Sequence, residues 1–398
     1  MKVGILTGGG DCPGLNAVIR AVTKSLIGYG QCEVLGIADG FEGLMAPQPQ
    51  ARPLRWDDVS GILHRGGTIL GTSNSANPLK DAATLAQVQA NVQALGLQVV
   101  VAIGGDGTMS LAHGVAQATG MHCVGVPKTI DNDIAHCERS FGFDTAVATV
   151  TEALHRVEST ANSHHRVMIV ETMGRHAGWL AGSAALATYA GAGPDLVYLP
   201  EVPFRMEEFW QDVDRIYRQN GSCMVAVSEG VQYADGRFVA ESGDRDVFGH
   251  TQLGGLGAML AESVKRQTGA KVRSIELSLL QRCASHVASK TDIDEAYMAG
   301  KAAVEAAVSG QTDKMVAFER ITENGIYSCK TKLIGLGEVA NVEKLVPREW
   351  LNARGNGVEQ PFIDYVLPLI QGETAMQKEC SLPRFAKLKK VLADPVQG

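Results

Sequence analysis

The stretch LQVVVAIGG, residues 97–105, decides the fold that this sequence predicts. It is a nearly continuous apolar run that ends in glycines, which is typical of a buried strand leading into a loop. Six further runs share this character: VGIL (3–6), CEVLGIA (32–38), CVGV (123–126), VMIVET (167–172), DLVYLP (195–200) and CMVAVSEG (223–230). Apolar runs without alternation are typical of parallel strands whose sheet is covered by helices on both faces.

Stretches of helical composition lie between these runs: GLNAVIRAVTKSLIGYG (14–30), DAATLAQVQANVQAL (81–95), TAVATVTEALHRVEST (145–160) and GWLAGSAALATYAG (178–191). Strands that alternate with helices over nearly 300 residues predict doubly wound α/β domains. A chain of 398 residues is long enough for two of them.

The composition points to a cytoplasmic protein. Apolar residues make up 45% and charged residues 20% of the chain, and we find neither a membrane span nor a signal peptide. The first strand-like run, extended to KVGIL, begins at residue 2, so we expect no targeting segment. A net charge of −7 without basic blocks argues against nucleic-acid binding. Eight scattered cysteines without a CxxC pair predict buried or idle thiols, with neither a disulfide framework nor a zinc site.

Unusual polar motifs follow the strand-like runs. They are GGGDCPG (8–14), GGDGT (104–108), PKTIDND (127–133), MGRHAG (173–178) and SEG (228–230). In doubly wound sheets, ligands bind beyond the carboxyl ends of the strands. We therefore expect these five motifs to lie on the ligand-binding side of the fold.

Two of these motifs suggest chemistry on a phosphate. In PKTIDND, one of the carboxylates Asp131 and Asp133 can act as a general base, and the other can reach a metal through water. In GGDGT, main-chain amides can wrap a phosphate chain while Asp106 holds the Mg²⁺ that phosphate brings. An ordinary turn is the alternative for both stretches, because turns also favour Gly, Asp and Asn.

The remaining candidates are weaker when each is taken alone. Glycines 8–10 allow a close approach to phosphate ahead of a helix N-terminus, or simply make a tight strand–helix turn. Four arginines lie next to strand-like runs: Arg166, Arg175, Arg273 and Arg282. Guanidinium groups suit phosphate, although each one alone can equally be a surface ion pair. The pair His164–His165 lacks a third metal ligand, so we interpret it as structural or surface.

Taken in chain order, these motifs resemble the 6-phosphofructokinases. The resemblance covers roughly residues 2–310 and rests on TGGGDCPGLNAVIR, RGGTILGTS, IGGDGT, PKTIDND, SHHRVMIVETMGRHAG, SEG, GHTQLGG and LLQR. Related NAD kinases and lipid kinases also carry GGDGT but lack PKTIDND and MGR. Those two motifs therefore carry the resemblance.

The resemblance implies two Rossmann-like domains with the active site in the cleft between them, plus a C-terminal extension. A donor-phosphate-binding domain would comprise residues 1–142 with about 282–336, and a fructose 6-phosphate-binding domain residues 143–281 with about 337–398. The implied reaction is the glycolytic, Mg²⁺-dependent transfer of a phosphoryl group to the 1-hydroxyl of fructose 6-phosphate, which gives fructose 1,6-bisphosphate.

Residue roles follow from the same resemblance. Asp131 would be the general base, and Thr129 and Arg175 would stabilise the transferring group. Asp106 and Asp133 would serve the metal. The donor phosphates would face Gly9, Gly104, Gly105, Asp106, Gly107 and Thr108. The substrate would contact Thr129, Ile130, Asp131, Met173, Gly174, Arg175, Glu229 and, through its 6-phosphate, Arg282. Arg166 and Arg273 match arginines that family members supply from a neighbouring subunit, so a homo-oligomer, dimer or tetramer, with shared active sites is implied.

The family divides between ATP and pyrophosphate as donor, and two positions report on this choice. Pyrophosphate enzymes carry Asp directly after the Asp of GGD, where it occupies the space of the ATP α-phosphate; this chain has Gly107. They also carry the lysine of PKTIDND, here Lys128, which would offset the charge of a leaving pyrophosphate and act in catalysis. A side chain that blocks a pocket is a harder constraint than an extra charge. ATP is therefore the expected donor and pyrophosphate the alternative.

Several positions depart from the common ATP-dependent pattern. Asn74 replaces an arginine that bridges donor and sugar phosphate, and Leu279 replaces a histidine that contacts the sugar phosphate. RQNGS (218–222) lacks the paired lysines of the bacterial effector site. The last 60 or so residues look more like the longer pyrophosphate-type chains, and we recognise no chemistry in them. A catalytically silent, sugar-phosphate-sensing paralogue is a further alternative, but a pure sensor needs no general base such as Asp131.

Overall fold

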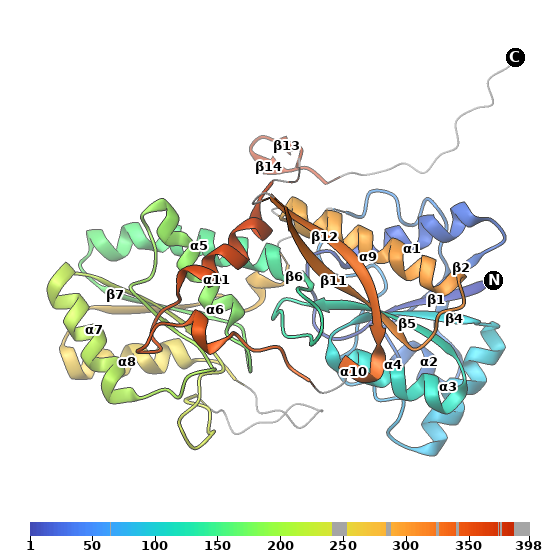
Figure 1. The fold of residues 1–398 in the computed structure, drawn as a ribbon, viewed down its shortest axis with the longest axis horizontal. Helices are drawn as coiled ribbons and strands as arrows, with labels where there is room; N and C mark the ends of the chain where they lie inside the picture. Colours follow the sequence, from blue (N-terminus) through green and yellow to red (C-terminus); the bar gives the residue numbers. More distant parts are fainter. Residues whose placement is uncertain are drawn as a thin grey trace, which may run out of the picture.

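Two α/β lobes lie side by side in the computed structural model of this chain (Figure 1). It describes residues 1–398 except 64, 241–252, 284–287, 324–325, 340–341, 373, 375 and 386–398. One lobe contains the N-terminal strands, and the other is built around the strands between residues 167 and 276.

The first lobe holds the larger sheet. Among the described residues this sheet has eight strands: β1 (Lys2–Thr7), β2 (Glu33–Ile37), β3 (Ala51–Pro53), β4 (Val99–Gly104), β5 (His122–Thr129), β6 (Phe141–Gly142), β11 (Lys314–Glu323) and β12 (Ile326–Gly335). Their order is β12-β11-β5-β4-β1-β2-β3, and β6 pairs with β5. Gly4 of β1 lies opposite Val100 and Val101 lies opposite Val124, all in parallel register. The apolar run LQVVVAIGG (97–105) thus contains the central strand β4.

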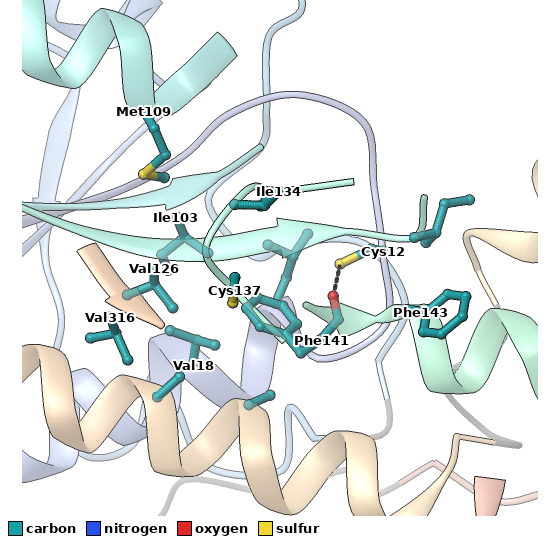
Figure 2. Packing of buried hydrophobic residues seen from close by; sticks show 14 of the residues in the cluster. Cys12, Val18, Ile103, Met109, Val126, Ile134, Cys137, Phe141, Phe143 and Val316 are labelled. Atoms are coloured by element: carbon teal, nitrogen blue, oxygen red, sulfur yellow. Dashed lines mark hydrogen bonds between the residues drawn. The ribbon is translucent and has the colours of Figure 1, made fainter. Parts of the chain in front are cut away.

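Helices cover both faces of this sheet (Figure 1). On one face lie α1 (Leu15–Tyr29) and α9 (Lys290–Val308); on the other lie α2 (Glu42–Met45), α3 (Ala82–Leu95), α4 (Asp106–Thr119) and α10 (Leu336–Val339). In α1, Val18, Val22 and Leu26 recur every fourth residue and are fully buried, as one face of a helix requires. Figure 2 shows Val18 in the same cluster as Val126 of β5 and Val316 of β11. Burial of such a side chain contributes about 1.5–3 kcal/mol, so this packing fixes the sheet that carries the motifs.

The second lobe holds a smaller, parallel sheet. Its order is β10 (Val272–Glu276), β7 (Val167–Thr172), β9 (Cys223–Ser228) and β8 (Leu196–Tyr198). The helices α5 (Phe143–Ser163) and α6 (Trp179–Ser183) pack on one side, and α7 (Met206–Asn220) and α8 (Leu256–Thr268) pack on the other.

The predicted fold class, doubly wound Rossmann-like parallel sheets, is confirmed by these two lobes. The predicted helix at 178–191 differs in part, because α-helical geometry ends at Ser183 and a 3-10 helix, η1 (Ala184–Ala190), continues the stretch. Throughout the part of the chain that the structure describes, no helix has the length and apolar character needed to cross a membrane.

A C-terminal segment, which we define as residues 342–370, passes from one lobe to the other. It follows the antiparallel pair β11–β12 and contains η4 (Arg348–Trp350), α11 (Gln360–Val366) and η5 (Leu367–Ile370); β13 (Lys378–Glu379) and β14 (Leu382–Pro383) come after it. Glu343 forms an isolated antiparallel bridge with Ile134 beyond β5. Farther along, α11 packs against α6 of the second lobe (Figure 1).

Candidate active site

Three of the predicted motifs meet at the carboxyl edge of the larger sheet. GGGDCPG follows β1, GGDGT begins at the end of β4, and PKTIDND runs through the end of β5. These strands are neighbours, with Thr7 opposite Ile103 and Gly104 opposite Pro127. Figure 2 shows the Cys12 thiol of the first loop directed at the Phe141 carbonyl oxygen of β6, at 3.8 Å. The three loops therefore lie next to one another and share one surface of the fold.

Within this surface, Thr108 packs between two glycines. A Cβ atom at Gly104 would lie 2.4 Å from the Thr108 hydroxyl oxygen, and one at Gly8 would lie 2.6 Å from it. Gly104 and Thr108 were predicted to bind the donor, and this close packing of Thr108 against Gly8 and Gly104 joins two of the loops. Gly105 is the N-cap of α4 and makes no side-chain cap, so the first main-chain N–H groups of that helix can bind an anion.

Gly107 leaves space next to these amides, and Gly9 holds a backbone conformation that suits glycine. Gly107 is exposed in the first turn of α4, and a Cβ atom there would meet nothing within 4 Å. Gly9 has a φ of +81°, a left-handed conformation that side chains disfavour. Both glycines keep the backbone accessible to a ligand.

Two basic side chains hold the loop after β1. Lys128 is 4% exposed, and its Nζ donates a hydrogen bond to the Gly10 carbonyl oxygen at 2.6 Å. Burial lowers the pKa of the Lys128 ammonium. Arg282 donates through Nη1 to the Asp11 carbonyl oxygen at 3.3 Å. Arg282, predicted to bind the sugar 6-phosphate, thus lies against the loop predicted to face the donor.

Three carboxylates, Asp106, Asp131 and Asp133, influence one another at the same edge. Burial raises the pKa of Asp133 to about 8, and the negative charges of Asp131 and Asp106 add to that shift. The Asp131 N–H donates to the Thr129 hydroxyl at 3.0 Å. Its carboxylate oxygen Oδ1 is buried and accepts no hydrogen bond from any described residue. An unpartnered buried carboxylate oxygen needs a hydrogen-bond donor, which a water molecule or a ligand can supply.

The same carboxylates fit a Mg²⁺ ion that is shared with a substrate. Within the described ranges, no group of three or more His, Cys, Asp or Glu side chains could hold a metal by itself. Mg²⁺ is usually bound by one or two carboxylates together with phosphate oxygens and water. Asp106 and Asp133 suit that role, since a cation would offset the burial and the neighbouring negative charges that raise the pKa of Asp133.

The loops of the smaller sheet form the other half of the site. Thr172 at the end of β7 lies opposite Ser228 at the end of β9, so MGRHAG and SEG are adjacent. The Met173 N–H donates to Gln281 Oε1 at 3.2 Å, and the Gly174 N–H donates to Glu229 Oε1 at 3.4 Å.

Two glycines let these loops approach each other closely. Gly174 has a φ of +132°, and a Cβ atom there would lie 2.7 Å from the Ala177 carbonyl oxygen. A Cβ atom at Gly230 would lie 1.8 Å from the Arg175 carbonyl oxygen. The position of the Arg175 backbone is therefore set by main-chain packing against the SEG loop.

Glu229 connects the two halves electrostatically. Burial, together with the nearby Asp131 charge, raises the pKa of Glu229 to about 7, and Arg175 opposes the shift. Because Asp131 belongs to the larger sheet and Glu229 to the smaller one, the predicted base and the predicted sugar-binding residues face a common space.

Other predicted residues lie away from this space. The Ile130 side chain is fully buried in the core, so only its main chain could reach a ligand. Arg166 immediately precedes β7, and Arg273 is near the start of β10. Both arginines lie near the amino ends of the strands, whereas Met173–Arg175 follow the carboxyl end of β7. The two ends of a strand are roughly 17 Å apart.

The secondary candidates are at the surface or outside the described residues. Asn74 is exposed next to Ser73, whose carbonyl oxygen accepts a hydrogen bond from the Gly9 N–H at 3.4 Å. Leu279 is also exposed, as are His164 and His165. Residues 249–252 of the motif GHTQLGG lie outside the described residues. All eight cysteines are free.

Sequence reasoning missed residues that shape the site from outside the motifs. Lys344 and Tyr365 of the C-terminal segment bond to Asn132, the amide between the two acids of PKTIDND. No local pattern distinguishes Lys344 from a surface lysine. Gln281 lies in the motif LLQR, and its complete burial points to a structural task.

Comparisons with known proteins agree with this arrangement. A family model described as phosphofructokinase matches residues 2–307. The pyrophosphate–fructose 6-phosphate 1-phosphotransferase of Amycolatopsis methanolica is 42% identical over 317 residues, which cover 80% of this chain and 90% of the relative. The ATP-dependent 6-phosphofructokinase 2 of Streptomyces coelicolor is 40% identical over 352 residues, 88% of this chain and 97% of the relative. The crystal structure of a pyrophosphate-dependent phosphofructokinase from Marinobacter aquaeolei matches with a TM-score of 0.84 and 29% identity, over 99% of this chain and 97% of that chain.

The two largely parallel sheets, the facing loops and these matches define an α/β phosphotransferase. The chain belongs to the phosphofructokinase family. Its relatives include both ATP-dependent and pyrophosphate-dependent enzymes.

Proposed function

We propose that this protein transfers a phosphoryl group from ATP, in the presence of Mg²⁺, to the 1-hydroxyl of fructose 6-phosphate. The observation that carries the proposal is the buried, unpartnered Oδ1 of Asp131, which belongs to the larger sheet while its charge acts on Glu229 of the smaller one. A sugar hydroxyl donating to that oxygen would satisfy it and would be ready to lose its proton.

The chain's own groups divide the remaining work. Asp131 takes the hydroxyl proton, while Thr129 and Arg175 steady the transferring group. Met173, Gly174 and Glu229 orient the sugar, and Arg282 binds its 6-phosphate. Gly9 and residues 104–108 offer main-chain amides to the donor. Mg²⁺, held by Asp106 and Asp133, would neutralise charge on the donor phosphates.

The domain division and the shared active site belong to the same proposal. The larger sheet, with residues 1–142 and about 282–336, would bind the donor, and the smaller sheet, with residues 143–281 and about 337–398, would bind the sugar phosphate. Arg166 and Arg273 lie at an edge remote from their own site, which favours a role in the site of a neighbouring copy. A homo-oligomer would complete the sugar-phosphate pocket in this way.

The open space at Gly107 supports ATP as the donor. We expect Gly107→Asp to lower kcat/KM for ATP by about 100-fold or more, because a carboxylate beside phosphate adds repulsion worth several kcal/mol. Activity with pyrophosphate should fall much less. Gly107→Ala is the matched control, since its Cβ meets nothing within 4 Å and brings no charge. Wild-type kcat/KM for ATP in the Asp variant would contradict the role given to this position.

Pyrophosphate is the second candidate donor, and Lys128 is the observation that favours it. The buried ammonium lies beside Gly9 and Gly10, where a cation could offset the charge of a leaving pyrophosphate. The 42% identical relative from Amycolatopsis methanolica carries a pyrophosphate-dependent name. Equal or faster turnover with pyrophosphate than with ATP would replace the first candidate by this one.

A further inference from the structure

The C-terminal segment, in which the sequence shows no chemistry, lies between the two halves of the active site. On one side it contacts the loop that carries Asp131 and Asp133. On the other side it contacts the start of α6, directly after MGRHAG. These contacts are polar and specific, and they involve main-chain atoms of both catalytic loops.

The first set of contacts comes from Lys344. Its ammonium donates to Asn132 Oδ1 at 3.1 Å and to the carbonyl oxygens of Cys137 and Glu138 at 3.0 and 2.6 Å. Its main-chain N–H donates to the Asp133 carbonyl oxygen at 2.7 Å. One residue from the C-terminal segment therefore holds the catalytic loop at four points.

Asn132 connects that loop to the C-terminal segment through its side chain. It is fully buried and has a φ of +55°, a left-handed conformation that asparagine tolerates better than most residues. Its Oδ1 accepts from Lys344, and its Nδ2 donates to the Tyr365 hydroxyl at 2.9 Å. Both side-chain bonds of Asn132 thus go to the C-terminal segment. The backbone turn at Asn132 sets the directions of Asp131 before it and Asp133 after it.

The second set of contacts reaches the smaller sheet. Trp179 Nε1 donates to the Lys344 carbonyl oxygen at 2.8 Å. Glu201 Oε1 accepts from the N–H groups of both Gly178 and Val346, each at 2.9 Å. Trp179 also stacks on Phe362 of α11, with ring centroids 5.9 Å apart. The same few residues are thereby tied to the end of MGRHAG.

We propose that Lys344 is a positioning residue for phosphoryl transfer. Through Asn132 it holds the Asp131 carboxylate, and through the rest of the C-terminal segment it fixes that carboxylate relative to the Arg175 loop. This inference rests on the proposed role of Asp131 as general base. It gives the C-terminal segment a function in catalysis.

The test is Lys344→Met in the full-length protein. We expect kcat to fall about 10- to 100-fold, as displacements of about 1 Å in a catalytic group do, with KM for fructose 6-phosphate and for the donor within about threefold of wild type. Lys332→Met is the matched control. It removes the same charge from the same cavity of about 320 Å³, and the Lys332 side chain, on β12, makes no hydrogen bond or ion pair with a described residue.

Rescue separates positioning from general damage. Lys344 lines that cavity, so Lys344→Ala leaves space that a small ammonium ion can enter. We expect ethylammonium to restore turnover to Lys344→Ala in a saturable way, whereas sodium at equal ionic strength does not. Wild-type kcat in both Lys344→Met and Lys344→Ala would overturn the proposal. A lower kcat, a higher KM and a lower midpoint of thermal unfolding, all without rescue by ethylammonium, would also overturn it.

Hydrogen exchange provides a readout that needs no activity. We expect faster exchange in residues 131–139 of Lys344→Met, with exchange in β4 and α4 unchanged. If wild-type protein transfers phosphate from neither donor, the proposed function has failed, and exchange alone then decides whether Lys344 holds the loop. Unchanged exchange in residues 131–139 would refute the positioning role in either case.

Discussion

Replacing Asp131 with serine is expected to lower kcat about a thousandfold or more while KM for fructose 6-phosphate changes little. A positioned general base contributes about 10²- to 10⁴-fold to a rate. The buried Oδ1 of Asp131 accepts no hydrogen bond from a described residue, so it is free to accept one from a substrate hydroxyl. The main-chain N–H of residue 131 donates to the Thr129 hydroxyl, so the serine variant keeps that hydrogen bond. Steady-state kinetics with the better donor measures the effect.

Two further variants sharpen this experiment. Asp131→Asn keeps the shape of the side chain and removes only its basicity, so it should lose nearly as much turnover as the serine variant. Asp294→Asn removes an exposed carboxylate that pairs with Lys290 on α9 and should behave as wild type. Near-normal turnover in Asp131→Ser would remove Asp131 from the mechanism.

Arg139→Met is expected to cause the largest loss of stability, about 3–5 kcal/mol in the free energy of unfolding. Arg139 is fully buried and lies against three carboxylates, those of Asp144, Asp292 and Glu295. Its Nη2 is 2.5 Å from Asp144 Oδ2 and 3.3 Å from Asp292 Oδ1. Without the guanidinium, the acids would remain buried and uncompensated. Urea unfolding of both proteins measures the difference.

The pH dependence of this loss has a definite sign. Burial raises the pKa of both Asp292 and Glu295, and Arg139 opposes that shift. Without Arg139 their folded-state pKa values rise further above the unfolded values. A raised carboxyl pKa gives stability that is present at low pH and lost as pH rises through the folded pKa. The deficit of Arg139→Met should therefore grow from acidic to alkaline buffer.

An exposed arginine provides the control for this variant. Arg156 pairs with Glu152 on the surface of α5, so Arg156→Met should unfold close to wild type. A deficit of Arg139→Met that matches the Arg156 control, or that shrinks as pH rises, would contradict the account of a compensating buried cation.

The fold was largely predictable because its signal is local. Each apolar run such as VVVAI is long enough to span one buried strand, and the glycines after it mark where the strand ends. Parallel pairing then brings the loops after β1, β4 and β5 to one edge without further information. The 3-10 geometry after Ser183 carries no comparable signal, and it was missed.

The site was predictable only in part, because some of its contacts join distant parts of the chain. Lys344 is more than 200 residues from Asn132 in sequence, and its partners are mostly carbonyl oxygens, which leave no trace in residue type. The cluster around Arg139 likewise joins α5 and α9. The close packing of Thr108 against Gly104 also depends on how the strand and the following helix meet, and residue type alone does not show it. Residue types in the loops thus allowed their chemistry to be predicted. The contacts that hold these loops in place depend on tertiary packing, which the sequence does not show.

The most direct test of the central claim is a parallel measurement of initial rates with fructose 6-phosphate and Mg²⁺, using ATP in one series and pyrophosphate in the other. The account predicts formation of fructose 1,6-bisphosphate with ATP, at a rate clearly above that with pyrophosphate. A faster reaction with pyrophosphate would show that Lys128, and not Gly107, reports the donor. Absence of product with both donors would contradict the proposed activity itself.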